Sequence, residues 1–345
     1  MKNTRLALAS LIALGLSACG GGGGGGSSTA TATTTDPAIT ISAGNMTTVA
    51  GMGASTVDMN ISVQQTSTDY VIGAEIQPQA AAKGPDLASL SLALLQKIKK
   101  SAPSNALAVG AQILETYPCA NGGSVQYSAT IADLNSDTFT PGDKGSLTMN
   151  ACSELGVVLN GALDFTVVSF VSDLNTVGGS EKHQLTYRDF KITNGAESLM
   201  VTGSSSFDIA RPTLEKLTGA LSSDSLSYTA QKGSQTGTLT LTGYRISFDR
   251  SEATRATTTT VSGTSAFNFP ALRGRFAVST VEPITASADR TETGGKVKIL
   301  GNNSALYLTY LSETQVKIEL DSNNDGVIDS TTTGTVAALG TSLWQ

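Results

Sequence analysis

Two acidic segments of the chain have the residue types and spacing of calcium-binding loops. In the stronger one, side-chain oxygens stand at loop positions one, three, five and nine, which are Asp321, Asn323, Asp325 and Asp329. Gly326 holds position six, and an apolar residue holds position eight, as in loops that wrap a calcium ion. Thr332 replaces the bidentate glutamate of position twelve. The segment therefore also fits a hairpin turn whose side chains bond the backbone.

The second acidic segment repeats the pattern less completely. Its oxygen-bearing residues are Asp133, Asn135, Asp137 and, further on, Asp143. Thr138 stands where the glycine should be, which weakens the case for an ion. The later loop resembles those of EF-hands and dockerin-like repeats, but its flanks, 316–320 and 335–338, read as strands. We take both segments as shaped turns first and as calcium sites second. Calcium is the only cofactor that the sequence suggests.

Residues suited to catalysis are scarce. His183 is the single histidine and stands in the polar run Glu181-Lys182-His183, which predicts a solvated side chain. There is no G-x-S-x-G, H-E-x-x-H or phosphate-binding P-loop motif. A carboxylate pair for glycoside hydrolysis stays open, although few aromatic residues are available to stack a sugar. We expect a protein that is not an enzyme.

The composition favours strands and argues against one class of partner. Of the 345 residues, 39% are apolar, 14% are charged and 5% are aromatic, and glycine, serine and threonine are abundant. Threonine favours strands while glycine and serine favour turns, so the fold should be mainly β. The net charge of −6 argues against nucleic acid as a partner, because binding phosphates needs a basic surface.

The N-terminal segment has the organisation of a targeting peptide. Lys2 and Arg5 precede an apolar run over 6–16 that is too short to cross a bilayer. The run ends Leu16-Ser17-Ala18-Cys19, which resembles the lipobox of bacterial lipoproteins. An ordinary secretory peptide or a membrane stub is the alternative.

The lipobox resemblance implies a lipid anchor. By it, residues 1–18 are removed and Cys19 is acylated, which anchors the protein stably in a membrane. Gly20 follows the cysteine, whereas aspartate there would imply retention in the inner membrane, so we expect the outer membrane. Without its leader the chain has a net charge of −8.

The same resemblance bears on the other two cysteines. With Cys19 acylated, Cys119 and Cys152 remain as an even pair, which an oxidising compartment should join in a disulfide. A metal site is the poorer alternative, since two distant cysteines and one histidine supply too few ligands.

Before Cys119 the chain should form a tether and a few helices. Residues 19–36 are rich in glycine, serine and threonine, as in a flexible tether. Within 37–118 we expect a short strand at 39–41 and a short helix capped by Asn45. An amphipathic helix at 85–100 either packs on the sheet or serves as a lid, plug or membrane-lying helix. A second helix at 104–115 is possible.

From Cys119 to residue 345 the sequence predicts an antiparallel meander that shares one domain with 37–118. The first hairpin should direct to one face the alternating residues Val125, Tyr127, Ala129 and Ile131 and their partners Leu147, Met149 and Ala151. After Cys152, alternating runs and turn signals such as Asn194-Gly195 predict about ten strands. We expect one large sheet curled as an open barrel or folded as a sandwich, with one or two helices packed on it. A transmembrane barrel would need aromatic girdles, and Trp344 is the only tryptophan.

Lipobox, tether, paired cysteines and the two D-x-N-x-D segments together resemble lipoproteins of Gram-negative bacteria that have no known activity. The first hypothesis is a non-enzymatic lipoprotein of the outer membrane, on its periplasmic or surface face. Its role would be structural or one of interaction with other envelope proteins. The alternative is a carrier that binds a lipid or another hydrophobic ligand inside a curled sheet, with the 85–100 helix as its lid.

Overall fold

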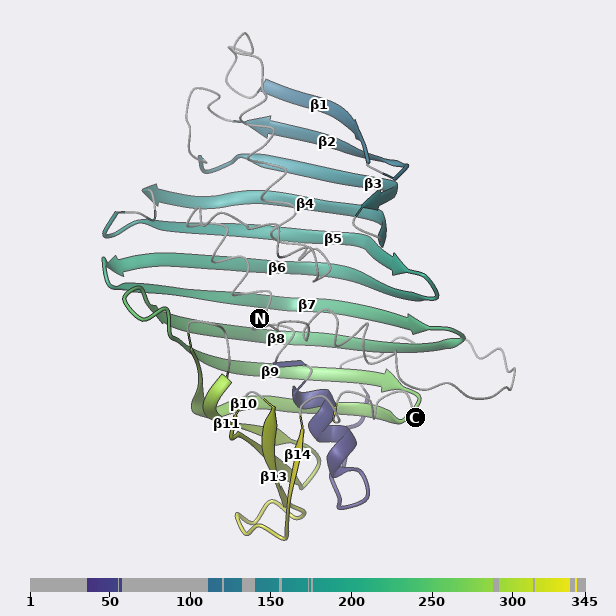
Figure 1. Ribbon diagram of the computed structural model, residues 1–345, viewed down its shortest axis with the longest axis vertical. Helices are drawn as coiled ribbons and strands as arrows, with labels where there is room; N and C mark the ends of the chain where they lie inside the picture. The colour runs from purple at the N-terminus through teal and green to yellow at the C-terminus, as the bar shows by residue number, and fades with distance from the viewer. Residues whose placement is uncertain are drawn as a thin grey trace.

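The computed structural model shows a single long antiparallel sheet with a helix beside its C-terminal strands (Figure 1). The structure describes residues 36–54, 56–57, 111–119, 121–131, 140–154, 157–172, 174, 176–287, 292–312, 314–335 and 339. Because the described residues lie mainly in strands, the prediction of a mainly β fold is confirmed.

Fourteen strands lie side by side in the order of the sequence, and each pairs antiparallel with the next. They are β1 (Ala111–Pro118), β2 (Ser124–Ile131), β3 (Lys144–Glu154), β4 (Val157–Ser172), β5 (Ser180–Asn194), β6 (Glu197–Thr213), β7 (Lys216–Lys232), β8 (Gln235–Ser251), β9 (Thr257–Phe269), β10 (Leu272–Ala286), β11 (Glu292–Leu300), β12 (Ala305–Tyr310), β13 (Gln315–Asp321) and β14 (Ser330–Thr335). Eleven of them follow Cys152, close to the ten or so predicted. The Asn194-Gly195 turn joins β5 to β6, with Asn194 paired to Glu197, as predicted.

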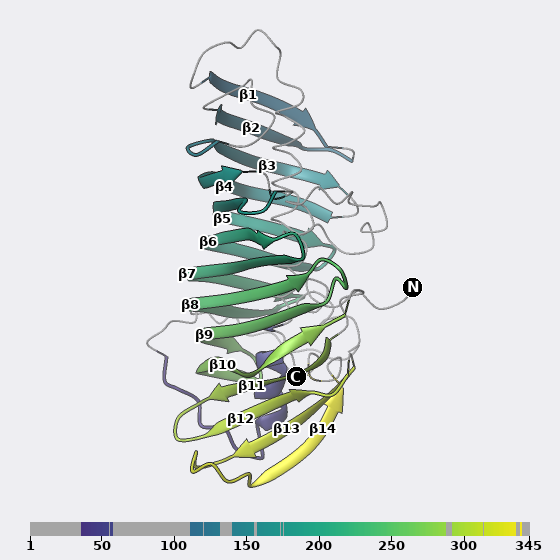
Figure 2. The same cartoon turned by 90° about the vertical axis from the view of Figure 1, so that its left-hand side faces the viewer.

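The sheet is open, and its direction changes toward the C-terminus. Strands β1 to β9 lie one above another in Figure 1, whereas β13 and β14 run upright at the lower end. Figure 2 shows that the strands curve as they cross the sheet. Because β1 and β14 lie at opposite ends of the strand order, the described strands form one open sheet and not a closed barrel.

One face of the sheet holds the core. Apolar side chains from β2 to β13 form one continuous buried cluster, and a smaller cluster lies under the ends of β6, β7 and β8. In β8 the buried large apolar residues are Leu239 and Leu241, and then Tyr244, Ile246 and Phe248. The change from odd to even numbers keeps all five on one face, because the strand carries a bulge between them.

Bulges opposite glycines recur across the middle of the sheet. At Asp189 of β5 the backbone has a φ of +48°, and the register shifts against both neighbouring strands. Gly161 of β4 lies against this bulge, with a φ of +90°, and an added Cβ would stand 2.2 Å from the carbonyl oxygen of Asp189. Three more glycines lie as closely against a shifted neighbour strand: Gly203, Gly263 and Gly295. Bulges and glycines are the features that bend sheets, which accounts for the curvature of this one.

The first hairpin confirms the predicted pairing of β2 with β3 but corrects one residue. Tyr127 pairs with Leu147, and both are buried. Ala151 was expected on the same face as Met149, yet it is exposed. It has a φ of +47° in a bulge between Met149 and Cys152. The extra residue turns Cys152 into the core in its place.

The N-terminal part packs against the C-terminal strands. Residues 46–54 and 56–57 are helical, and Gly53 lies so close to β11 that an added Cβ would be 2.1 Å from Cδ1 of Ile299. The helix begins after Asn45 as predicted, but the Asn45 side chain bonds backward, to the Ser42 N–H and the Thr40 carbonyl. The predicted strand at 39–41 is wrong, since only an isolated bridge joins Ala38 to Arg275.

The helix predicted over 104–115 is also wrong from residue 111 onward. Residues 111–118 are strand β1, in register with β2 from Ala111 opposite Ile131 to Pro118 opposite Ser124. Eight paired positions along β2 outweigh the weak helical propensity of this short segment.

Several predictions lie outside the described residues. They are the anchor at Cys19, the helix 85–100, the loop residues Asp133, Asn135 and Asp137, and the tether 19–36 except its last residue, Asp36, which is buried. Among the described residues, no helix combines the length and the apolar character needed to cross a bilayer.

Candidate functional site

The acidic loop between β13 and β14 is organised around Asp321. This side chain is fully buried, and its two oxygens accept hydrogen bonds from the backbone N–H groups of Asp325 (3.1 Å) and Gly326 (2.9 Å). Asn323 Oδ1 accepts from the Asp325 N–H at 3.2 Å, and Asp325 Oδ1 accepts from the Val327 N–H at 2.8 Å. Each oxygen-bearing residue thus shapes the backbone ahead of it, as Asx turns do.

Asp329 closes the loop. Its Oδ2 accepts from the hydroxyl of Ser322 at 2.5 Å and from the backbone N–H of Ser322 at 2.8 Å. These two hydrogen bonds, that of the hydroxyl first, stabilise the charged form and lower the pKa of the Asp329 carboxyl. Strand β14 then begins at Ser330, so Thr332 of loop position twelve belongs to a strand paired with β13.

The loop fits a shaped turn better than a formed ion cage. Within the described part of the chain, no three acidic, histidine or cysteine side chains converge as metal ligands. From the other acidic segment the structure describes Asp143, which is buried and accepts hydrogen bonds from the N–H and hydroxyl of Thr140 at 2.9 Å each. Calcium binding by either loop stays a prediction.

Beside the acidic loop, the outward face of β11, β12 and β13 carries a small charged network. The ammonium groups of Lys296 and Lys317 lie 3.0 and 2.8 Å from the Glu319 carboxylate. The hydrogen bond from Lys317 is the largest cause that lowers the pKa of Glu319, and Lys296 adds to it. Lys298 stands 5.5 Å from the centre of the Tyr307 ring and donates to Asn324 of the loop at 3.2 Å. These contacts tie the loop to the sheet.

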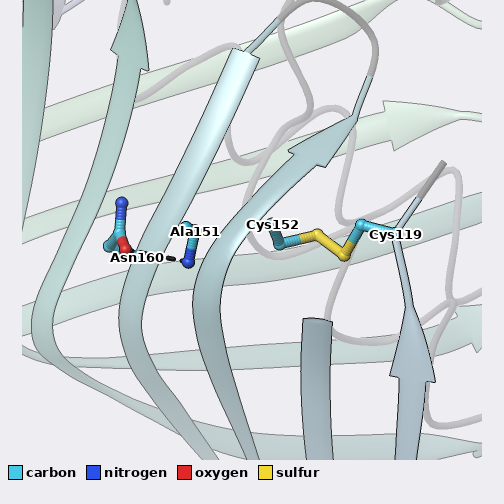
Figure 3. The surroundings of a disulfide bond; sticks show 4 residues. All are labelled: Cys119, Ala151, Cys152 and Asn160. Atoms are coloured by element: carbon cyan, nitrogen blue, oxygen red, sulfur yellow. Dashed lines mark hydrogen bonds between the residues drawn. A yellow bond between two sulfur atoms is a disulfide. The ribbon is translucent and has the colours of Figure 1, made fainter. Parts of the chain in front are cut away.

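The predicted cysteine pair is joined (Figure 3). The Cα atoms of Cys119 and Cys152 are 5.4 Å apart, and both side chains are buried. Beside them, Asn160 Oδ1 accepts from the backbone N–H of Ala151 at 3.0 Å, which holds the bulge that directs Cys152 inward. The bond connects the end of β1 to β3 across the intervening β2. Its burial suits a structural bond rather than an exchanging one.

His183 is not solvated, contrary to prediction. It is 2% exposed, its Nε2 lies 2.9 Å from a carboxylate oxygen of Glu181, and its ring stacks on Phe165. The strand continues the alternation of Leu185 and Tyr187 backward, which places both polar residues on the core face. This alternation could have predicted that His183 is buried, but the polar residues around it pointed to a solvated side chain.

Arg211 is a second buried polar residue that sequence reasoning missed. It is 7% exposed, and its guanidinium donates to the carbonyl oxygens of Leu174 and Leu214 and to the Glu252 carboxylate. One side chain thereby joins the β4–β5, β6–β7 and β8–β9 connections at one end of the sheet. Burial lowers the pKa of the adjacent Arg250, against the opposing charge of Glu252. The sequence does place Arg211 two residues after Ile209 in the alternation of Phe207 and Ile209, and this position indicates a buried cation.

A groove crosses the sheet from β4 to β10 and has a volume of about 590 Å³. Most of its lining side chains alternate with core residues, as Ser247 does between Ile246 and Phe248, and so point away from the apolar face. Its polar lining includes Lys182, Asp208, Thr218, Arg245, Ser247 and Asp249. Small residues, among them the buried Ala220, make room for the groove between the longer side chains.

Comparison of the chain with protein-family models, with curated protein sequences and with solved structures found no match. Two features of the described residues offer surface for contacts, namely the groove and the acidic loop.

Proposed function

We propose that this protein is a non-enzymatic lipoprotein of the outer membrane whose sheet serves in interaction with other molecules of the envelope. The observation that carries the proposal is the division of the sheet into two faces. One face is committed to the core, and the other presents polar side chains and a groove across seven strands. Such a surface suits binding, because it is broad and lined by groups of both charges. The anchor rests on the lipobox at Cys19.

Cell fractionation tests the anchor. The full chain should sediment with outer membranes and incorporate labelled palmitate, whereas Cys19→Ser should lose the label and become soluble, because it lacks the acylated thiol. Ser27→Ala, in the same segment, is the matched control and should behave as wild type. Retention of Cys19→Ser in the membrane would overturn the anchor.

A carrier of hydrophobic molecules is the second candidate, and one observation favours it. Apolar side chains continue along the core face from β2 to β13, and because they are buried in the chain alone, an acyl chain would take the place of part of this packing. Native mass spectrometry of Cys19→Ser protein, purified without detergent, should then show a co-purifying lipid. A single species with the mass of the polypeptide alone would exclude the carrier.

A further inference from the structure

The groove on the outward face has the length and lining of a site for an extended polar chain. Its lining runs from Ser169 on β4 to Pro283 on β10, so it spans seven neighbouring strands. At the usual spacing between strands, that distance is about 28 Å. The groove crosses the strands, and hydroxyl groups such as those of Thr218, Ser247 and Thr258 recur along it. A ligand that fills it must be elongated and able to make hydrogen bonds at regular intervals.

Most of the outward charge at the groove is already paired. Lys182 lies 3.7 Å from Asp208, and Lys216 lies 3.0 Å from Asp249. Glu181 belongs to the core face, where His183 contacts it. These contacts neutralise the carboxylates at the groove.

Arg245 is the cation left over. Its Nε donates to the hydroxyl of Ser247 at 3.1 Å, and no carboxylate in the described part of the chain forms an ion pair with it. An arginine held by a serine at its Nε keeps its terminal nitrogens for a ligand. That planar pair of donors matches a carboxylate.

The lining distinguishes a sugar chain from a peptide. A peptide strand binds by adding to a sheet edge or by placing side chains in apolar pockets. This groove lies on a sheet face and is bordered by hydroxyl, carboxylate and guanidinium groups, which hydrogen-bond to sugar hydroxyls. The repeat from strand to strand is comparable to the length of one pyranose unit in an extended chain.

We propose that the groove binds an acidic oligosaccharide, with Arg245 holding one of its carboxylates. The proposal rests on the interaction role proposed above and names the class of its ligand. It does not involve Cys19, so a failure here leaves the result of the fractionation experiment unaffected.

Calorimetric titration of the full chain, purified in detergent, tests the proposal with hexagalacturonate and the neutral sugar maltohexaose. Hexagalacturonate should bind about tenfold more tightly, the size expected of a charge-assisted hydrogen bond. Arg245→Gln should abolish that preference. The matched control is Arg188→Gln, an exposed arginine on the same face that pairs with Asp164 outside the groove. It should leave binding unchanged.

A second variant tests the groove independently of charge. Thr258→Tyr fills the groove from an exposed position and should weaken both sugars, while its thermal melting stays that of wild type. Equal affinity for the two sugars, or equal losses in Arg245→Gln and Arg188→Gln, would overturn the proposal. So would hexaglutamate binding as tightly as hexagalacturonate, since the site would then recognise a peptide or any polyanion.

Discussion

Three carboxylates of the described turns act as acceptors for nearby backbone groups. Asp321 and Asp143 are buried, and each accepts hydrogen bonds from residues within five positions. Asp329 does the same from an exposed position. Buried charge is tolerated at these turns because each carboxylate oxygen has a donor.

Asp321→Ala should lower the free energy of unfolding by about 1–3 kcal/mol, because the Gly326 N–H would lose its acceptor and the Asp325 N–H would keep only Asn323 Oδ1. Asp325→Ala, an exposed position with a single backbone partner through Oδ1, should cost less. Urea denaturation of both variants measures the difference. Equal losses would contradict the central place of Asp321 in the loop.

The calcium prediction has a direct test. If the loop is a shaped turn, millimolar calcium should leave the melting temperature unchanged in wild type and in Asp325→Ala, because ligand binding to the native state alone raises stability. A rise in wild type that is absent from Asp325→Ala would instead establish the ion. Differential scanning calorimetry in chelator and in calcium separates the two.

Glu319 makes stability depend on pH in a defined direction. Its pKa in the folded protein is lowered from the ordinary 4.5, so its contribution is present above that pH and is lost as the pH falls through the folded value. Glu319→Gln should therefore flatten the loss of stability between about pH 5 and pH 3. Asp224→Asn, an exposed carboxylate on β7, is the control. If both variants keep the slope of wild type in acid unfolding, the Lys296 and Lys317 contacts are not the cause.

At the scale of elements, the curvature of the sheet depends on bulges that lie opposite glycines of the neighbouring strand. A bulge adds a residue to one strand, and the neighbour must approach it without a side chain. Gly161 and Asp189 show this arrangement most clearly. The bends let long strands curve while their apolar residues stay on one face.

Gly161→Ala should destabilise the protein more than Gly233→Ala does. Both glycines have positive φ, but an added Cβ at Gly161 meets the Asp189 carbonyl, whereas at Gly233 it meets open space. We expect about 1 kcal/mol at Gly233 from the backbone conformation alone, and at least about 2 kcal/mol at Gly161. Thermal melting of the two variants measures this. Equal losses of stability would mean that the close approach of β4 and β5 at Gly161 does not contribute to the free energy of unfolding.

Alternation in the sequence predicted the strands after Cys119, but not β1, whose first residues were predicted as helix. Within the predicted strands it failed where a bulge or a buried polar residue interrupted the pattern. The shift of the apolar alternation from odd to even positions between Tyr187 and Phe190 can be read from the sequence, because apolar residues stand on both sides of the bulge. Alanine is small enough to lie on either face of the sheet, so the sequence around Ala151 does not indicate the bulge. His183 is buried because it continues the alternation of Leu185 and Tyr187, whereas its polar neighbours predicted a solvated side chain.

At the scale of the whole molecule, the protein is nearly one-dimensional. Each strand makes its main contacts with the strands before and after it in the sequence. Stability in such an array is a sum of neighbour terms, and the ends can open before the middle. The Cys119–Cys152 bond reinforces one end by joining β1 to β3.

Removing that bond should loosen one end of the sheet alone. In the chain-entropy model a loop of 33 residues' separation is worth about 3–4 kcal/mol, so the Cys119→Ser/Cys152→Ser protein should be less stable by up to that amount. Hydrogen exchange should accelerate in β1–β3 and stay unchanged in β11–β13. Uniform acceleration along the chain would show that the sheet unfolds as one cooperative unit.

The candidate groove could not be predicted from the sequence. Its lining is drawn one or two residues at a time from strands spread over 169–283, and those residues are common surface types. Only the order and register of seven strands bring Lys182, Arg245 and Thr258 to one surface. The acidic loop was predictable because its residues are contiguous.

The attachment of residues 36–41 decides how the protein would carry mechanical load. Asp36 binds Arg273 and Arg275, and the Ile39 carbonyl accepts from Asn302, so this segment is fastened to β10 and to the β11–β12 turn. Tension from an N-terminal anchor would enter the sheet there and not at either edge strand. The first bonds to bear that tension would be those of Asp36 and Ile39, and behind them lies β10, which is hydrogen-bonded to a strand on each side, whereas an edge strand has a single neighbour.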